Sequence, residues 1–278
     1  MDNQQVVLIT GASSGIGKDA ARLLAGKGFK VYGAARNLAK MEELKAYGVT
    51  ILPLDITDQK SVDACVDEIL AAEDRIDILI NNAGYGSFGP TEVVPLEEAR
   101  RQFEVNLFGL AALIQKVLPV MRNQQNGRII NVSSMAAYFS EPNGGWYHAT
   151  KAALERYSDS LRMEVKRFNI KVVLIQPGMI HTEWQVIAGQ HLIKSAENTV
   201  YEESARHQAA LFDMGYKHAS KPEVVARAIV RVAASKRPCL RYKVGGMAKP
   251  ILFLRKIFNQ SDAPEGSSSI AHASAIFR

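Results

Sequence analysis

The sequence has few of the residues that build cross-links and metal sites. Only two cysteines occur, Cys65 and Cys239, and two cannot form a disulfide framework or a cysteine-rich zinc site. The six histidines are scattered, and we interpret His148 as a helix-surface residue rather than a ligand. The sequence therefore predicts no metal centre, and its cysteine usage is typical of a reduced, cytoplasmic setting.

Long hydrophobic runs are also missing. No uninterrupted apolar run reaches the roughly 18 residues that a membrane span requires. The opening MDNQQVVLIT is acidic and polar before a short apolar run, which is not the pattern of a signal peptide. Hydrophobic residues make up 47% of the chain and charged residues 22%, as is usual for globular proteins. The 278 residues suit one sizeable α/β domain or two small ones.

Excess positive charge is absent from most of the chain. The net charge is +6, but residues 221–278 hold 11 Lys and Arg against 3 Asp and Glu, whereas the preceding part is slightly acidic. A nucleic-acid footprint would extend across the fold, so we expect no nucleic-acid partner. The basic end is either an ordinary solvated surface or a region attracted to an anionic membrane face or an acidic ligand.

Short β-branched runs alternate with amphipathic stretches along the chain. Nearly continuous apolar strands separated by helices predict a parallel sheet covered on both faces, and right-handed crossovers make this a Rossmann-type, doubly wound α/β fold. The predicted strands are 6–10, 30–35, 49–54, 76–81, 127–133 and 170–176. The predicted helices are 18–25, 39–47, 61–72, 96–122 and 147–168.

No linker or internal repeat divides the chain, so we expect one catalytic domain over residues 1–258 and a flexible tail over 259–278. The alternation lapses between Pro177 and Lys221, and a connection of this length predicts a substrate lid at about 183–220. A helix resumes at 221–235, and LRYKV is a candidate last strand. The stretch AKPILFLRKIF predicts a short amphipathic helix that contacts a membrane surface or packs over the lid or a partner subunit.

A glycine-rich turn joins the first strand to the first helix. Gly11, Gly15 and Gly17 follow VVLIT with the spacing GxxxGxG. Glycines let the backbone approach a pyrophosphate closely, and the following helix N-terminus offers unpaired N–H groups. A turn of this composition can also be purely structural, but its place between a strand and a helix favours dinucleotide binding.

The end of the second predicted strand bears on the choice of cofactor. An acidic residue there would bind the adenosine ribose and select NAD. The sequence instead has neutral Ala35 followed by Arg36, whose guanidinium suits a 2′-phosphate, and the hydroxyls of Ser13 and Ser14 can add to it. The sequence therefore predicts NADP(H) in preference to NAD(H). The alternative is that Arg36 is a surface arginine without a ligand.

Tyr147 and Lys151 are four residues apart in a predicted helix and share one of its faces. We expect the lysine cation to lower the pKa of the phenol and to make its proton exchangeable. The YxxxK pattern also arises by chance on amphipathic helices. Ser134 follows the end of a predicted strand, where ligands of α/β sheets bind. The amide of Asn106 lies among apolar helix residues and needs a partner, either in a site or in the core.

Taken in order, these motifs resemble the short-chain dehydrogenase/reductase family, over roughly residues 5–245. The detailed sequence looks most like its 17β-hydroxysteroid-dehydrogenase-like and retinol-dehydrogenase-like branch. The motifs that carry the resemblance are TGASSGIG at 10–17, NNAG at 81–84, Asn106, Ser134, YHATK at 147–151 and PGMIHT at 177–182.

The resemblance implies a role for each matched residue. Tyr147 would exchange a proton with the substrate oxygen, Ser134 would orient that oxygen, and Asn106 would bind a water linked to the lysine. Lys151 would hold the nicotinamide ribose and depress the pKa of the tyrosine. The predicted cofactor contacts are Gly11, Ser13, Ser14, Gly15, Ile16, Gly17, Arg36, Asp55, Ile56, Asn82, Ala83, Gly84, Tyr147, Lys151, Pro177, Gly178, Ile180 and Thr182.

The apolar residues after Thr182 predict a pocket for an apolar carbonyl compound or secondary alcohol, such as a steroid, a retinoid or an acyl-chain ketone. Tyr85, Phe139 and Trp184 are candidate pocket walls; alternatively, the lid residues pack on one another or on another subunit. The resemblance also implies a homodimer or homotetramer formed through the long helices.

The predicted function is an NADP(H)-dependent carbonyl reductase or alcohol dehydrogenase that transfers a hydride. One alternative is a non-catalytic NADP(H)-sensing protein on the same fold, against which the complete Ser134, Tyr147, Lys151 and Asn106 set argues. The other is a sugar-nucleotide epimerase or dehydratase. Such enzymes share YxxxK but usually carry a different glycine spacing and a larger substrate domain.

Overall fold

A single parallel sheet forms the centre of the molecule in the computed structural model, which describes residues 4–217, 219–246 and 248. Its seven strands run in the order β3-β2-β1-β4-β5-β6-β7, and every neighbouring pair is parallel. The predicted doubly wound α/β fold is confirmed. The strands are β1 (Val6–Thr10), β2 (Lys30–Ala35), β3 (Thr50–Pro53), β4 (Ile78–Asn81), β5 (Gly127–Val132), β6 (Ile170–Pro177) and β7 (Arg241–Val244).

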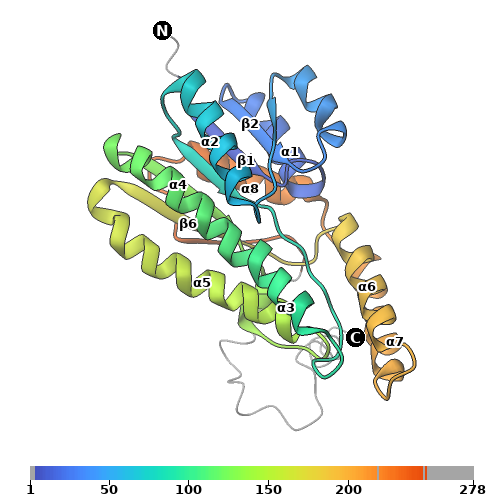
Figure 1. Cartoon of the computed structure of the whole chain (residues 1–278). Helices are drawn as coiled ribbons and strands as arrows, with labels where there is room; N and C mark the ends of the chain where they lie inside the picture. The colour runs from blue at the N-terminus through green and yellow to red at the C-terminus, as the bar shows by residue number, and fades with distance from the viewer. Residues whose placement is uncertain (1–3, 218, 247, 249–278) are drawn as a thin grey trace.

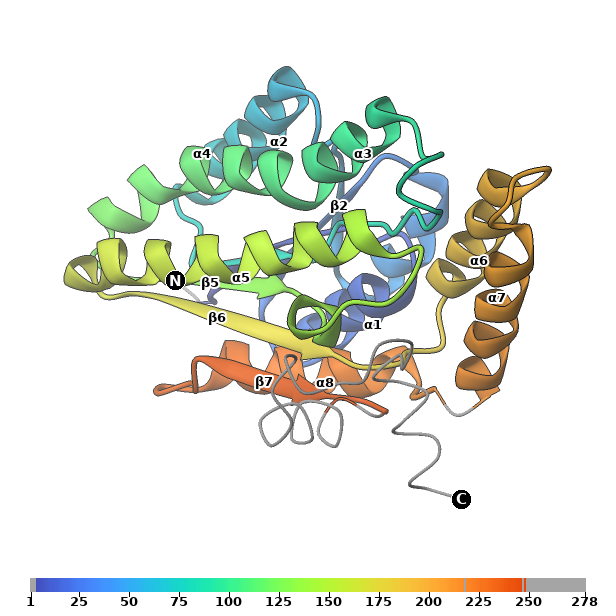
Figure 2. The same cartoon turned by 90° about the horizontal axis from the view of Figure 1, so that it is seen from below.

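Helices cover both faces of this sheet (Figure 2). Each face of the sheet has its own hydrophobic core, and each core is covered by its own group of helices. Because successive strand residues point to opposite faces, Val6 and Leu8 of β1 pack with the first group and Val7 and Ile9 pack with the second. The first group is α2 (Gln59–Glu73), α4 (Gly109–Asn123) and α5 (Gly145–Val165). The second is α1 (Gly15–Ala25), α8 (Pro222–Ala234) and the 3₁₀ helix η1 (Ala39–Tyr47), where the sequence predicted an ordinary helix.

The strand order reverses between β1 and β4, which opens a crevice at the carboxyl ends of the strands. The predicted lid lies beside this end as a pair of helices, α6 (Glu183–Ala196) and α7 (Glu202–Lys217), packed side by side (Figures 1 and 2). The proposed helix at 248–258, apart from Ala248, and the tail at 259–278 lie outside the described residues.

The long helix predicted at 96–122 is interrupted. It consists of α3 (Leu96–Phe103), a π-helical turn η2 (Glu104–Phe108) and α4. Single π turns inside helices occur frequently at functional sites. Among the described residues, Leu96–Asn123 is the one helical segment long and apolar enough to cross a membrane. The apolar face of α4, however, packs into the core that the sheet forms with α2 and α5.

Candidate active site

A cavity of about 1870 Å³ extends from the glycine turn to the two lid helices. It contains nearly all of the site residues predicted from the sequence; of these, Gly17 and Asn106 do not line it. The predicted residues that do line it are Gly11, Ser13, Ser14, Gly15, Ile16, Arg36, Asp55, Ile56, Asn82, Ala83, Gly84, Tyr85, Ser134, Phe139, Tyr147, Lys151, Pro177, Gly178, Ile180, Thr182 and Trp184.

The glycine turn has a backbone shape that requires glycine. Gly11 and Gly15 have φ angles of 68° and 53°, in the left-handed region that side chains disfavour. Gly17 lies behind the turn, where a Cβ would overlap the carbonyl oxygen of Gly11, so this glycine serves close packing. Ser14 precedes α1 without capping it through its side chain, which leaves the first-turn N–H groups available.

The nucleotide end of the cavity holds the exposed guanidinium of Arg36, directly after β2. The carboxylate of Asp55 beside it accepts hydrogen bonds from the backbone N–H and hydroxyl of Thr57, at 3.0 and 2.7 Å. These bonds, with the charges of Arg36 and Arg101, hold the pKa of Asp55 below its usual range. Arg101 on α3 also lines the cavity, and sequence reasoning missed it because nothing local connects α3 to the end of β2.

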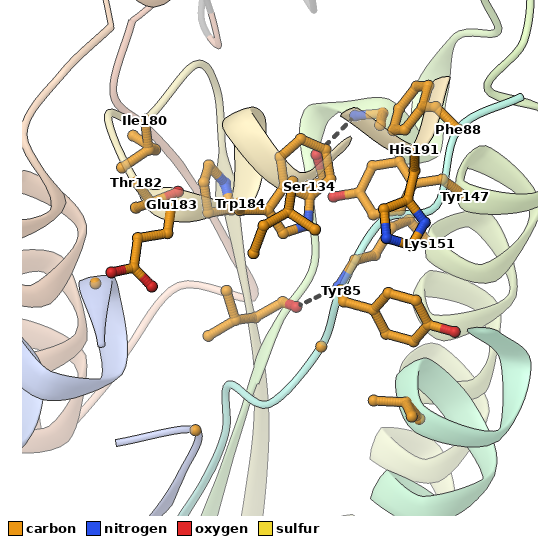
Figure 3. A pocket seen from close by; sticks show the side chains of 18 of the residues that line it. Tyr85, Phe88, Ser134, Tyr147, Lys151, Ile180, Thr182, Glu183, Trp184 and His191 are labelled. Atoms are coloured by element: carbon orange, nitrogen blue, oxygen red, sulfur yellow. Dashed lines mark hydrogen bonds between the residues drawn. The ribbon is translucent and has the colours of Figure 1, made fainter. Parts of the chain in front are cut away.

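Ser134, Tyr147 and Lys151 meet at the centre of the cavity (Figure 3). Ser134 caps the 3₁₀ helix η3 (Met135–Tyr138), its hydroxyl accepting the N–H of Ala136 at 3.1 Å, and its side chain acts to lower the pKa of the Tyr147 phenol. The Nζ atom of Lys151 donates to the carbonyl of Val132 at 3.1 Å and lies 5.9 Å from the centre of the Tyr147 ring. The three groups predicted to act together are therefore neighbours.

The predicted direction of the tyrosine pKa is wrong for this geometry. Tyr147 is only 8% exposed, and burial raises the pKa of its phenol to about 12, with the charge of Glu141 adding to the rise and the side chain of Ser134 opposing it. Lys151 is 7% exposed, and burial lowers the pKa of its amine to about 8, opposed by the charge of Glu155. Burial, which the sequence does not show, decides the direction of the shift.

Asn106 lies in the π turn, outside the cavity lining, and its amide is fully used. Its Oδ1 accepts the backbone N–H of Tyr85 at 3.0 Å, and its Nδ2 donates to the carbonyl of the same residue at 2.8 Å. The Nδ2 also donates to the hydroxyl of Thr150, which is on α5 between Tyr147 and Lys151. Asn106 thus ties the 84–86 loop to α5, and its predicted water-binding role stays a prediction.

The rings of Phe88 and Trp184 pack against Tyr147 (Figure 3). The centroids of Phe88 and Trp184 lie 5.5 and 5.0 Å from that of Tyr147, and Phe88 also meets Phe212 of α7 at 5.1 Å. A Cβ on Gly86 would overlap the indole of Trp184, so a glycine is needed for this packing. The sequence predicted Trp184 as a pocket wall and the apolar lid residues, Phe212 among them, as an enclosure, but it missed Phe88, whose neighbours are remote in the chain.

His148 is a correction to the sequence analysis. It is 4% exposed rather than on the helix surface, and its Nδ1 lies 2.8 Å from the carbonyl oxygen of Ala136. Its ring packs edge-on against Phe139, with centroids 5.2 Å apart. The segment between Ser134 and Tyr147 folds back over α5 and covers this histidine, which helical spacing alone does not predict.

Comparison with known proteins agrees with this architecture. A family model described as short chain dehydrogenase matches residues 5–191. A probable short-chain type dehydrogenase/reductase of Helicobacter pylori is 36% identical over 256 residues, covering 92% of this chain and 94% of that protein. A 3-ketodihydrosphingosine reductase of Bacteroides thetaiotaomicron is 36% identical over 255 residues, covering 90% and 91%. The chain belongs to the short-chain dehydrogenase family.

A solved structure shares the whole architecture. A short-chain dehydrogenase from Streptomyces avermitilis superposes with a TM-score of 0.80 at 30% identity, over 92% of this chain and 93% of that one. As a short-chain dehydrogenase, the protein is an oxidoreductase that works with a nicotinamide cofactor. Its own residues fit such a group, because the left-handed glycines and the uncapped α1 N-terminus form a cradle that a Cβ would fill.

Proposed function

We propose that the protein is an NADPH-dependent reductase of apolar ketones, of steroid-, retinoid- or lipid-like character. The observation that carries the proposal is a buried, protonated phenol between two chemically different ends of one cavity. On one side are the glycine turn and Arg36, and on the other are the rings of Phe88 and Trp184.

Tyr147 is protonated at neutral pH, which is the state that carbonyl reduction needs. With a pKa of about 12, the phenol keeps its proton at pH 7 and can donate it to an oxygen that gains negative charge. Ser134 also lines the cavity and can donate to the same oxygen. One such donor is worth about 3–4 kcal/mol in the transition state.

The preference for NADPH depends on charge at the end of β2. Neutral Ala35 stands where an acidic residue would bind a ribose 2′-hydroxyl, and the guanidinium of Arg36, directly after it, lines the cavity beside Asp55. We expect Arg36 to hold the 2′-phosphate, the α1 N-terminus the pyrophosphate, and Lys151 the nicotinamide ribose. Bound in this cradle, the cofactor supplies the hydride.

The choice of an apolar substrate rests on the aromatic walls around Tyr147 and on the lid helices. The name of the Bacteroides relative designates reduction of a keto group on a sphingosine, which supports a lipid-like substrate. The test is to follow the loss of NADPH absorbance with ketones graded in chain length and polarity. We expect kcat/KM to rise with the apolar part of the ketone. Failure to reduce any carbonyl would refute the proposal and favour the NADP(H)-sensing alternative.

A further inference from the structure

One wall of the aromatic cavity is polar. Helix α7 and the loop between Phe139 and Gly144 contribute carboxylate, amide, hydroxyl and imidazole groups to the lining of the cavity that holds Tyr147, and a hydrogen bond from Asn143 to Gln208 joins the loop to the helix. We call Glu141 and Gln208, the two half-buried or buried members of this wall, the polar corner. Neither residue exchanges a proton with the substrate in the proposed reaction, and both carry unused hydrogen-bonding capacity.

Glu141 contributes a carboxylate that no donor in the described part of the chain hydrogen-bonds. Its side chain is 13% exposed, and among the described residues its only ion-pair partner is the Nε2 of His148, at 3.5 Å. This distance is longer than an ordinary hydrogen bond. The Nδ1 of His148 faces the carbonyl of Ala136, which only accepts, so in the neutral ring Nδ1 carries the hydrogen and Nε2 has none to donate. The carboxylate therefore has room for a donor from a ligand.

Gln208 contributes an amide with one satisfied end. It is 6% exposed and lines the cavity, and its Oε1 accepts a hydrogen bond from Nδ2 of Asn143 at 2.7 Å. Its Nε2 is buried without a hydrogen-bond partner among the described residues. An unpaired buried donor destabilises a protein, so this N–H group needs an acceptor. Because Asn143 is two residues from Glu141, its hydrogen bond holds the Gln208 amide against the loop that carries Glu141.

We infer that the polar corner binds a hydroxyl group on the ketone substrate, with the hydroxyl donating to Glu141 and accepting from Nε2 of Gln208. A hydroxyl is the small group that serves both needs at once, because it is donor and acceptor together. An ammonium group would satisfy Glu141 but leave the Gln208 N–H without an acceptor. A carboxylate or phosphate would be repelled by Glu141.

The inference deepens the proposed function and rests on it. Glu141 lies close to the reacting centre, because its carboxylate is 3.5 Å from Nε2 of His148, whose ring centroid is 6.1 Å from that of Tyr147. A hydroxyl held there belongs near the carbonyl, as in an α- or β-hydroxyketone, while the apolar remainder lies among the rings of Phe88 and Trp184. The substrate class becomes a hydroxyketone with a long apolar part.

The experiment compares ketones that differ in one group. For the wild-type protein with NADPH, kcat/KM is measured for a long-chain methyl ketone and for its α-hydroxy, β-hydroxy and α-amino counterparts. We expect one of the two hydroxyketones to exceed the plain ketone by roughly 10–100-fold, the value of a hydrogen bond to a charged group. In Glu141→Gln and Gln208→Met this ratio should fall toward one. Because the ratio is taken within one protein, a partly unfolded variant does not distort it.

A matched control is Glu97→Gln, an exposed glutamate on α3 outside the cavity, which should keep the wild-type ratio. Equal rates for plain ketone and hydroxyketones in the wild type, or an unchanged ratio in both variants, would overturn the inference and leave the ketone reductase standing. A preference for the α-aminoketone would also overturn the inference, because it would show that the polar corner binds a cation and not a hydroxyl. Reduction of none of these ketones would refute the proposed function together with the inference.

Discussion

The two ends of the cavity are built from different parts of the chain. The nucleotide end is mainly backbone, shaped by the left-handed Gly11 and Gly15 and by the N-terminus of α1. The substrate end is made of side chains such as Phe88, Trp184 and Phe212, which come from segments far apart in the sequence. Substitutions at the first end should therefore change which cofactor binds, and those at the second should change which ketone is reduced.

The largest loss of activity should follow from a substitution at Tyr147, which lies between the two ends of the cavity. Tyr147→Phe removes the proton donor but keeps the ring that packs on Phe88 and Trp184. We expect kcat to fall by about 10²–10⁴-fold, the usual contribution of a positioned acid. NADPH affinity, measured by fluorescence titration, should change little, because the glycine turn and Arg36 are untouched.

Tyr157→Phe is the control for this change. Tyr157 is on the same helix, but it packs against the core that the sheet forms with α2, α4 and α5 and does not line the cavity. Removing its hydroxyl should therefore leave kcat near the wild-type value. Substantial turnover in Tyr147→Phe would show that another group supplies the proton and that Tyr147 is not the reacting group between the two ends of the cavity.

The next effect should be confined to the nucleotide end. Arg36→Ala removes the guanidinium proposed to hold the 2′-phosphate, and we expect the Kd for NADPH to rise by roughly 10–100-fold while that for NADH stays nearly constant. Titration of both cofactors on one preparation measures the difference. Arg227→Ala, which removes an exposed arginine of α8 paired with Glu223, is the matched control. Equal losses for NADPH and NADH would remove the phosphate role.

A smaller effect is expected at the substrate end. Trp184→Ala takes away a ring that packs on Tyr147 and fills the space over Gly86. We expect KM for long apolar ketones to rise about tenfold, in proportion to lost apolar contact, and KM for short ketones to rise less. Trp184→Phe should recover part of the difference. A rise that is independent of ketone length would mean that Trp184 supports the lid and not the substrate.

The nucleotide end could be predicted from the sequence because its determinants are local. The bounds of β2 were predicted to the residue, and Gly11 and Gly15 have the turn conformation that their spacing indicates. Glycines, β-branched runs and strand ends act within a few residues of one another, so no remote contact is needed to interpret them. The same holds for the four-residue spacing of Tyr147 and Lys151.

The features that were missed depend on contacts between distant segments. The stretch EVNLF has an ordinary helical pattern, and it forms a π turn where Asn106 pairs with the backbone of Tyr85, twenty-one residues earlier in the chain. His148 was placed on the surface because its cover comes from the folded-back segment around Ala136. The pKa of Tyr147 was given the wrong direction because burial is a property of the whole fold.

The smallest predicted effect links the polar corner to the chemistry. Burial is the main reason for the raised pKa of Tyr147, and the negative charge of Glu141 adds to it, so Glu141→Gln should lower that pKa without restoring an ordinary value. Alcohol oxidation needs the deprotonated phenol, and its rate rises with pH through the pKa of Tyr147. In Glu141→Gln this rise should therefore begin at lower pH, whereas Glu97→Gln should leave the profile in place. Ser134, Lys151 and His148, which also lie near the phenol, are unchanged in both variants. A profile that stays fixed or moves to higher pH in Glu141→Gln would show that the charge does not reach the phenol, and would separate substrate choice from proton transfer at this end of the cavity.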